Sequence, residues 1–348
     1  MTIEVGFGLI TCQRYPGDGR TDAELYAEAL DLAVLAEDLG FDSVWVSEHH
    51  FVDDAYLPAL MPLCAAIAAR TTRIRIGTAL LLAPMYPPLR LAEDAAVVDL
   101  ISAGRLTLGL GLGWRPEEFE AFGIPMGERG PRLEETVSLL RHAWSGTLVT
   151  GAPDLPGPGV RVTPDPPAAG GPPIWIGALR EPAVRRAGRI GDGFMATDPT
   201  RERFARQVGW AREALEKSGR DDAGFAFSLH AATVAWEGPD EEAWTLFGPH
   251  LRYVDWKYDD MEDARARTGP PPAPPPMSPD EERDLRAHAL MGPPEQVAAG
   301  IRSFAEIAGG TLHFIARMYW PGIGPERQRE TMRLFAETVI PVLRGSGM

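Results

Sequence analysis

The alternation of short apolar runs with amphipathic helical segments is the feature that most constrains the fold of this chain. Eight apolar runs have the length of a strand: Ile3–Leu9, Ser43–Ser47, Ile74–Leu82, Leu106–Leu110, Ile174–Gly177, Gly193–Ala196, Phe225–Val234 and Thr311–Ala316. Segments with helical periodicity lie between or after them: Asp22–Leu39, Pro58–Arg70, Leu89–Ile101, Arg132–Trp144, Glu181–Arg189, Glu202–Ser218, Pro293–Ala308 and Glu326–Leu343. Apolar strands that alternate with helices are typical of a parallel sheet covered by helices. The pattern predicts an α/β fold, a single parallel (β/α)8 TIM barrel over residues 1–348.

Two stretches interrupt the alternation. Residues 146–173 are rich in glycine and proline, and residues 256–291 contain the run GPPPAPPPMSP at Gly269–Pro279. This proline content predicts irregular insertions without regular helix or central strand. Because strands and helices resume after each stretch, we expect insertion loops rather than domain boundaries. We expect the second loop to close over the strand ends when ligand binds.

Charge and cysteine content exclude several classes of function. The chain has 49 acidic and 34 Lys or Arg residues, a net charge of −15, so it lacks the basic footprint of a nucleic-acid-binding protein. Its first residues have no basic segment before an apolar one, and no run of 18 apolar residues follows. Cys12 and Cys64 form neither a metal motif nor a disulfide framework. We therefore expect a cytoplasmic protein without a membrane span or a metal centre.

The polar triplet Glu48-His49-His50 follows the second predicted strand. Active sites of parallel barrels lie at the carboxyl ends of the strands, where this triplet falls. Adjacent strand residues point to opposite faces, which favours one working imidazole with a supporting acid over a metal chelate. An imidazole titrates near neutral pH and suits proton transfer. The alternative is a hydrogen-bonded loop cluster without a catalytic role.

Glycines mark two further strands. In the fourth predicted strand, alternating glycines that include Gly111 clear one face for a flat ligand, although barrel packing explains them equally well. The fifth ends in Gly177-Ala178-Leu179-Arg180, and a helix follows at Glu181. Small residues before a helix N-terminus form an anion site, to which Arg180 adds charge. The alternative is an ordinary turn with a surface arginine.

Long segments of the chain resemble the bacterial-luciferase-like family of flavin-dependent oxidoreductases, and the resemblance covers nearly the whole chain. The segments that carry it are LGFDSVWVSEHHF (39–51), RIRIGTALLLAPMYPPLRLAEDAAVVDLISAGRLTLGLGLGW (73–114), EEFEAFGIPMGERGPRLEE (117–135), PPIWIGA (172–178) and GPPEQVAAGIRSFAE near the end. The resemblance implies a barrel that holds flavin at the carboxyl ends of its strands.

The resemblance also implies roles for individual residues. His49 serves proton transfer in the active site, and a cis peptide between Ala79 and Leu80 makes room beneath the isoalloxazine ring. The flavin phosphate binds around three consecutive residues: Ala178, Leu179 and Arg180.

The chain departs from the luciferases in its phosphate site. Leu112 stands where luciferases have an arginine, and Leu179-Arg180 stands where they have Glu-Ser. We therefore expect the phosphate to be bound by different residues, with Arg180 in place of the luciferase arginine.

On the eighth predicted strand, His313, Arg317 and Tyr319 are expected to approach the same face. Arg317 is there a second candidate ligand for an anion or for the substrate. The alternative is a salt bridge at the barrel rim.

These observations predict a monooxygenase that uses reduced FMN and oxygen on a small organic substrate, served by a separate flavin reductase and assembled as a homodimer. A second hypothesis is a deazaflavin-dependent dehydrogenase or reductase, a branch that segments 114–119 and 128–132 also resemble. A third is a non-catalytic flavin-binding subunit, against which the intact His49 argues.

Overall fold

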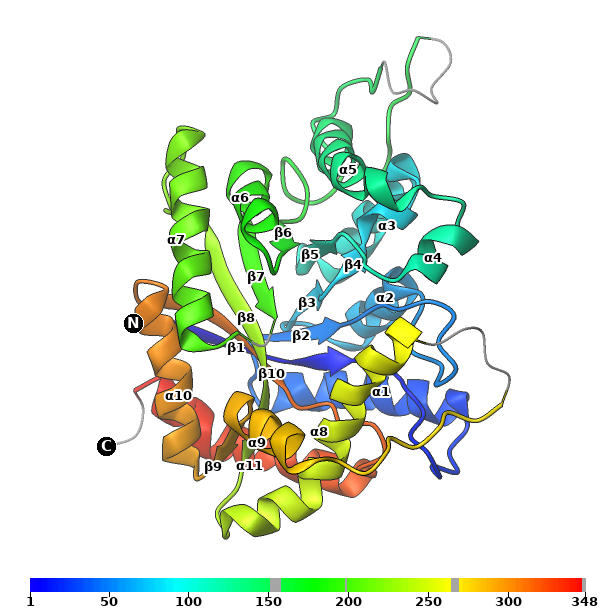
Figure 1. The fold of residues 1–348 in the computed structure, drawn as a ribbon. Helices are drawn as coiled ribbons and strands as arrows, with labels where there is room; N and C mark the ends of the chain where they lie inside the picture. The colour runs from blue at the N-terminus through cyan, green and yellow to red at the C-terminus, as the bar shows by residue number, and fades with distance from the viewer. Residues whose placement is uncertain (151–157, 198, 264–268, 346–348) are drawn as a thin grey trace.

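Eight parallel strands close into a barrel in the computed structural model, which describes residues 1–150, 158–197, 199–263 and 269–345 (Figure 1). The barrel strands are β1 (Thr2–Ile10), β2 (Ser43–Val46), β3 (Arg75–Thr78), β5 (Leu106–Gly111), β6 (Ile174–Gly177), β7 (Gly193–Thr197), β8 (Ala226–Ala235) and β10 (Thr311–Arg317). Each pairs with the next in that order, and β10 pairs with both β8 and β1. The predicted TIM barrel is therefore confirmed, and every predicted strand coincides with one of these eight.

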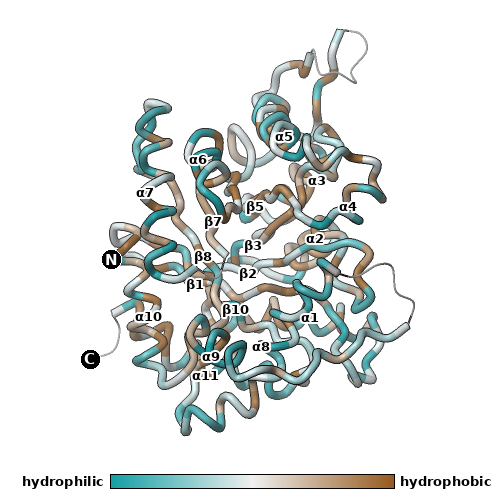
Figure 2. The backbone as a smooth tube through the Cα atoms, viewed as in Figure 1, coloured by the Kyte–Doolittle hydropathy of each residue, from teal (hydrophilic) through white to brown (hydrophobic). Residues whose placement is uncertain are grey.

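Helices surround the barrel: α1 (Asp22–Asp38), α2 (Leu60–Arg70), α3 (Pro88–Ser102), α5 (Arg129–Ala143), α6 (Glu181–Ile190), α7 (Arg201–Lys217), α10 (Pro294–Ile307) and α11 (Pro325–Leu343). Local sequence sets their ends. For example, Thr21 and Glu24 form a capping box at the start of α1, and Gly40 follows its end with a φ of +81°. Figure 2 shows apolar residues along the strands and polar residues on the outer turns of the helices. None of the described helices is long and apolar enough to cross a membrane.

Large aromatic side chains fill the barrel interior. Trp45 stacks on Trp175 with ring centroids 5.2 Å apart. A Cβ on Gly77 would lie 2.2 Å from the Trp45 ring, so the glycine of β3 is needed to admit this side chain. Leu80 and Ile315 pack against the same cluster. The interior is a packed core, and ligands must bind at its ends.

The prediction of an irregular segment over residues 256–291 is wrong in part. Helix α8 (Asp240–Asp263) runs past residue 256, α9 (Pro279–His288) follows, and β9 (Leu290–Gly292) pairs with β8. Proline-rich sequence fills only residues 270–276, while Pro279 occupies the first turn of α9, where proline is tolerated. The run predicted at Ile74–Leu82 is divided into β3 and the short β4 (Leu81–Leu82), and the short helix α4 (Pro116–Ala121) was not predicted.

The insertion predicted at residues 146–173 is irregular where the structure describes it. Its described part contains one isolated antiparallel bridge, between Val149 and Val160. Residues 151–157 of this insertion and residues 264–268 of the other lie outside the described chain. The closure predicted for the proline-rich loop stays a prediction.

His313 lies at the opposite end of the barrel from Arg317, so the two side chains share the inner face of β10 but not one site. Its Nε2 is 2.8 Å from Ser43 Oγ, and its Nδ1 is 3.0 Å from Glu4 at the start of β1. Both residues point into the barrel, but four residues of strand separate them by roughly 13 Å. Tyr319 is also absent from the site, because it is buried in the main core beyond the strand.

The Glu4–His313 contact makes acid stability depend on Glu4. The hydrogen bond from His313 lowers the pKa of Glu4 to about 2, and Arg75 acts in the same direction. A carboxylate with a lowered pKa stabilises the fold above its ordinary pKa of 4.5, and this contribution is lost as pH falls toward 2. When the free energy of unfolding is measured in urea at pH values between 4.5 and 2, it should fall less with decreasing pH for Glu4→Gln than for the wild type. Exposed Glu216→Gln is the control; an identical pH dependence for Glu4→Gln and the wild type would contradict the prediction.

Candidate active site

His49 lies just beyond the carboxyl end of β2 and is 4% exposed. Its Nδ1 is 2.9 Å from Oε1 of Glu118, a fully buried residue of α4. The same Oε1 accepts a hydrogen bond of 2.9 Å from the backbone N–H of His50. An ionised carboxylate only accepts hydrogen bonds, so Nδ1 of His49 carries a proton and Nε2 of the neutral ring is free to accept one. Nε2 forms no hydrogen bond within the described residues.

The structure shows that Glu48 is not the acid that supports His49. Glu48 does not contact His49; its Oε1 is 2.6 Å from Nε2 of His50 and accepts a hydrogen bond of 3.1 Å from Tyr86. Residues 47–50 follow the end of β2, and in this segment Glu48 turns toward His50 while His49 turns toward Glu118. Burial raises the pKa of Glu48, and His50 opposes this effect. Glu48 and His50 thus form a buried pair beside the site, and the partner of His49 is Glu118.

An enclosure of three aromatic rings surrounds His49: Tyr56, Trp114 and Tyr258 lie with ring centroids 4.9, 5.6 and 5.5 Å from the imidazole. All three meet it edge to face. The guanidinium of Arg317 lies over the ring of Tyr258, 5.9 Å from its centre. The ring of Tyr258 thus contacts both Arg317 and His49. Such an enclosure limits water around Nε2 and strengthens electrostatic interactions there.

Helix α8, which supplies Tyr258, is held over the strand ends by polar contacts. Lys257 is 1% exposed and pairs with Asp53 of the loop after β2 and, at 2.8 Å, with Asp260. Arg115 donates hydrogen bonds to the carbonyls of His50, at 2.6 Å, and Met261, at 3.4 Å. These contacts join α8 to both segments that carry the His49–Glu118 pair.

The cis peptide implied by the resemblance is present between Ala79 and Leu80. Leu80 turns toward the glycine-bearing strands: a Cβ on Gly177 would lie 1.9 Å from its side chain, and one on Gly111 would lie 3.0 Å from it. These glycines therefore make room for Leu80, which favours the packing explanation over direct contact with a flat ligand. Leu80 forms an apolar floor beneath the strand ends, and such a floor suits a flavin ring.

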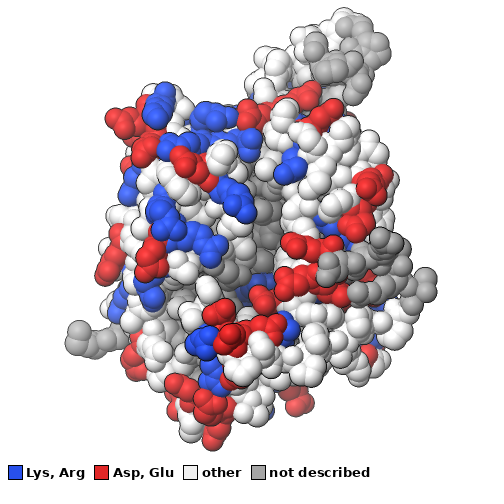
Figure 3. Space-filling model, viewed as in Figure 1, with Lys and Arg blue, Asp and Glu red and all other residues white. Residues whose placement is uncertain are grey.

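The loop after β6 has the character of an anion site. Leu179 is 49% exposed, Arg180 is exposed and Ala178 is buried. Arg180 is the N-cap residue of α6, and no side chain caps the helix there. Arg180 forms no ion pair within the described residues. The unpaired guanidinium of Arg180 fits a phosphate, whereas the helix start adds little, because Pro182 has no N–H and the N–H of Ala183 already donates to the carbonyl of Arg180. Figure 3 shows basic side chains gathered over α6 and α7.

Sequence reasoning missed Glu118 and the aromatic enclosure. Glu118 lies in the quoted segment 117–135, but α4 has only six residues, too short for a periodicity to mark its inner face. The enclosure joins residues from three distant segments, which only the fold brings together. Within the described residues, no group of three or more His, Cys, Asp or Glu side chains is arranged to hold a metal.

Replacing His50 with alanine should destabilise the fold rather than remove the proton acceptor. Glu48 would remain buried without its hydrogen bond to the imidazole, at a cost of about 1–3 kcal/mol. Thermal unfolding of His50→Ala should show the loss, and exposed His142→Ala should not. Wild-type stability combined with abolished turnover would mean that His50 faces the reaction.

A comparison with protein families matches residues 5–311 to the luciferase-like monooxygenase family. The chain belongs to this family. It is therefore a luciferase-like oxidoreductase, as the sequence resemblance implied.

Relatives within the family differ in their cofactor. The oxygenase component of a flavin-dependent trigonelline monooxygenase from Acinetobacter baylyi is 31% identical over 51% of this chain and 49% of its own length. An F420-dependent glucose-6-phosphate dehydrogenase from Kineococcus radiotolerans is 28% identical over 93% of this chain and 96% of its own. The monooxygenase RslO1 from Streptomyces bottropensis has a similar crystal structure, with a TM-score of 0.84, 26% identity, and coverage of 98% and 99% of the two chains. The luciferase-like barrel thus carries either flavin or F420 chemistry, and the matched region spans only about half of the Acinetobacter protein.

Proposed function

We propose that this luciferase-like protein is a monooxygenase that uses reduced FMN and oxygen on a small organic substrate. The buried His49–Glu118 pair inside its aromatic enclosure carries the proposal, because it combines a proton acceptor with exclusion of water. The likeness to RslO1 over nearly the full length of both chains supports it.

The residues of this chain divide the work between binding and proton transfer. Arg180 would hold the FMN phosphate, and Ala79, Leu80 and Gly111 would lie beneath its ring. When bound, reduced FMN supplies the electrons that activate oxygen. Nε2 of His49 exchanges a proton with the reacting centre, and Glu118 holds the imidazole in the tautomer that this requires.

A separate flavin reductase would supply the reduced cofactor. The Acinetobacter relative is named as an oxygenase component, which supports a division between reduction and oxygenation.

The second candidate is an F420-dependent dehydrogenase, favoured by the relative from Kineococcus, which matches along nearly its entire length. Equilibrium titration of the purified chain with FMN and with F420, followed by absorbance and fluorescence, separates the two. We expect saturable FMN binding that weakens in Arg180→Ala. Binding of F420 without binding of FMN would overturn the monooxygenase proposal.

A further inference from the structure

The phosphate loop, residues 178–180 after β6, supplies one cation to the proposed cofactor site. A phosphate monoester carries about 1.5 to 2 negative charges at pH 7, which the guanidinium of Arg180 alone does not balance. Helix α7 follows β7, the strand that pairs with β6, and Figure 3 shows further basic side chains over α6 and α7. A second cation from α7 would complete the neutralisation of the phosphate.

Gln207 of α7 joins this helix to the phosphate loop. Its side chain is 0% exposed, and its Nε2 donates a hydrogen bond of 3.0 Å to the carbonyl of Leu179. Because Leu179 directly precedes Arg180, this bond fixes one face of α7 against the segment that carries the guanidinium.

Arg203 lies on the same face of α7 as Gln207, one turn closer to the start of the helix. Residues four apart on a helix are neighbours on its surface. Helix α7 begins at Arg201, just beyond the carboxyl end of β7, so Arg203 belongs to the turn nearest the strand ends. Long side chains on a helix lean toward its N-terminus, which carries the guanidinium of Arg203 further toward those ends.

Contacts on both sides of Arg203 show what this part of α7 faces. At about 100° per residue, the direction of Arg203 around the helix axis falls between those of Gln207 and Glu213. Gln207 contacts the phosphate loop, and Glu213 pairs with Arg185 of α6 at 2.9 Å. Arg203 therefore faces the beginning of α6, where Arg180 is the N-cap residue.

No side chain of the described chain occupies the guanidinium of Arg203. It is partly buried, yet it forms neither a hydrogen bond nor an ion pair with any residue that the structure describes. Glu181, the acid at the start of α6, is already paired with Arg185 at 2.7 Å. Arg180 and Arg203 thus border the same loop as two guanidinium groups without an acid between them.

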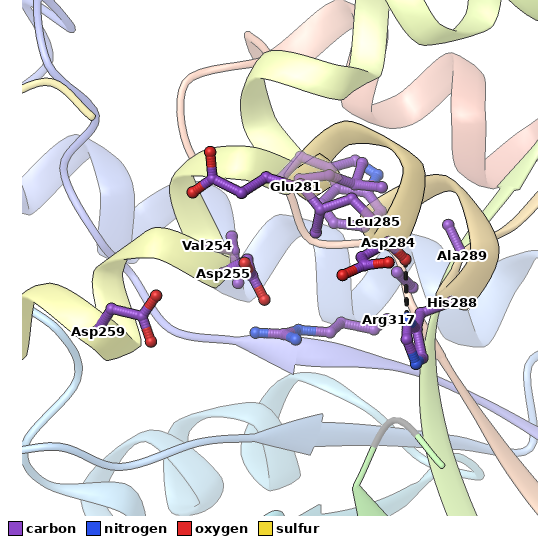
Figure 4. A pocket seen from close by; sticks show the side chains of 12 residues that line it. Val254, Asp255, Asp259, Glu281, Asp284, Leu285, His288, Ala289 and Arg317 are labelled. Carbon is purple, nitrogen blue, oxygen red and sulfur yellow. Dashed lines mark hydrogen bonds between the residues drawn. The ribbon is translucent and has the colours of Figure 1, made fainter. Parts of the chain in front are cut away.

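Arg317 is the alternative cation at the strand ends, but its surroundings differ. It enters a pocket between α8, α9 and the end of β10 that is also lined by Asp255, Asp259 and Asp284. Figure 4 shows Arg317 extending toward Asp255 and Asp259. Carboxylates close to a guanidinium compete with a phosphate for it, so Arg203 is better suited to share the phosphate with Arg180.

We propose that Arg203 is a second cation of the cofactor phosphate site, and that the phosphate is held between its guanidinium and that of Arg180. Gln207 is a positioning residue, because its bond to the carbonyl of Leu179 sets the phosphate loop relative to α7. The inference rests on the phosphate loop of the function proposed above. It does not depend on the choice between FMN and F420, since both cofactors carry a phosphate.

Riboflavin, which is FMN without its phosphate, isolates the contribution of the phosphate. In fluorescence titrations of the full chain, the wild type should bind FMN more tightly than riboflavin, and this preference should shrink as ionic strength rises. Arg203→Ala should bind FMN about tenfold more weakly and riboflavin as the wild type does. In Arg180→Ala/Arg203→Ala the two flavins should bind with nearly equal affinity. An undiminished preference for FMN in Arg203→Ala would overturn the proposal.

Arg201→Ala is the matched control. Arg201 lies in the same first turn of α7, but its Nε donates to Oγ of Ser303 on α10 at 2.7 Å. The control removes the same charge from the same turn and should keep the wild-type preference for FMN. Equal losses in Arg201→Ala and Arg203→Ala would indicate long-range attraction instead of contact and would contradict the proposal.

Gln207→Leu tests the positioning role. Leucine has a similar volume but cannot donate to the carbonyl of Leu179, so the preference for FMN over riboflavin should fall although both arginines remain. Unchanged riboflavin affinity shows that the variant is folded. A folded variant with the wild-type preference would remove Gln207 from the account of the site.

F420 and its deazaflavin chromophore without the phosphate-bearing tail provide the same comparison for the second candidate function. If the chain binds F420 and not FMN, the monooxygenase proposal fails, while a selective loss of F420 affinity in Arg203→Ala still supports the second cation. A wild type that binds each phosphorylated cofactor no more tightly than its phosphate-free counterpart would overturn the inference for either reaction.

Discussion

The His49→Ala variant is expected to turn over its substrate about 10²- to 10⁴-fold more slowly than the wild type, which is the usual contribution of a positioned acid or base. Its affinity for FMN should stay within a few-fold of the wild-type value, because the loop proposed to hold the phosphate, residues 178–180, follows a different strand, β6. Steady-state turnover and flavin titration on the same preparation measure both quantities.

His50→Ala provides the comparison for this prediction. It removes a neighbouring imidazole that contacts Glu48 and leaves the His49–Glu118 pair in place. If His50→Ala abolished turnover in folded protein and His49→Ala did not, the two histidines would have exchanged roles. If neither variant were slower, the reaction would occur away from this pair, and Arg317 would be the next residue to examine.

The Glu118→Gln variant is expected to lower kcat about 10²-fold or more with little change in KM. The amide oxygen of glutamine can still accept the hydrogen bond from the N–H of His50. The same oxygen also accepts the hydrogen bond from Nδ1 of His49, but the amide carries no charge and therefore stabilises the protonated imidazole less than the carboxylate does. The acid limb of the pH–rate profile should shift, which a purely structural defect would not cause.

Two variants keep this prediction separable from misfolding. Glu118→Asp retains the carboxylate and should recover part of the lost rate, while Glu120→Gln changes an exposed acid of the same helix and should behave as the wild type. An unchanged pH profile in Glu118→Gln, together with wild-type turnover, would show that the carboxylate does not govern His49.

The barrel could be predicted from sequence because its strands are buried on both faces and its helices are amphipathic, so each element is marked locally. Helix α8 was missed: no helix was predicted before residue 256, and its last turns lie in the segment 256–291, which was expected to be irregular because of the proline run that begins after residue 269. The position of His313 shows a second limit: strand periodicity gave its direction but not the end of the barrel at which it acts.

The candidate site could be predicted only where its residues are adjacent in sequence. Glu48, His49 and His50 were found together, but Glu48 pairs with His50 and not with His49, as the prediction had it. The acid that pairs with His49 comes from residue 118, and no local pattern connects two positions 69 residues apart. Neither could any local pattern show that Leu80, rather than a ligand, occupies the space left by Gly177.

The proposed monooxygenase activity requires that this barrel use reduced FMN to activate oxygen in a site closed to water. Its most direct test is to mix reduced FMN with oxygen in the presence of stoichiometric protein and to follow flavin oxidation and hydrogen peroxide release together. The wild type should delay peroxide release relative to free reduced FMN, and Arg180→Ala, which binds FMN more weakly, should delay it less. Peroxide released by the wild type as fast as by free reduced FMN would contradict the claim.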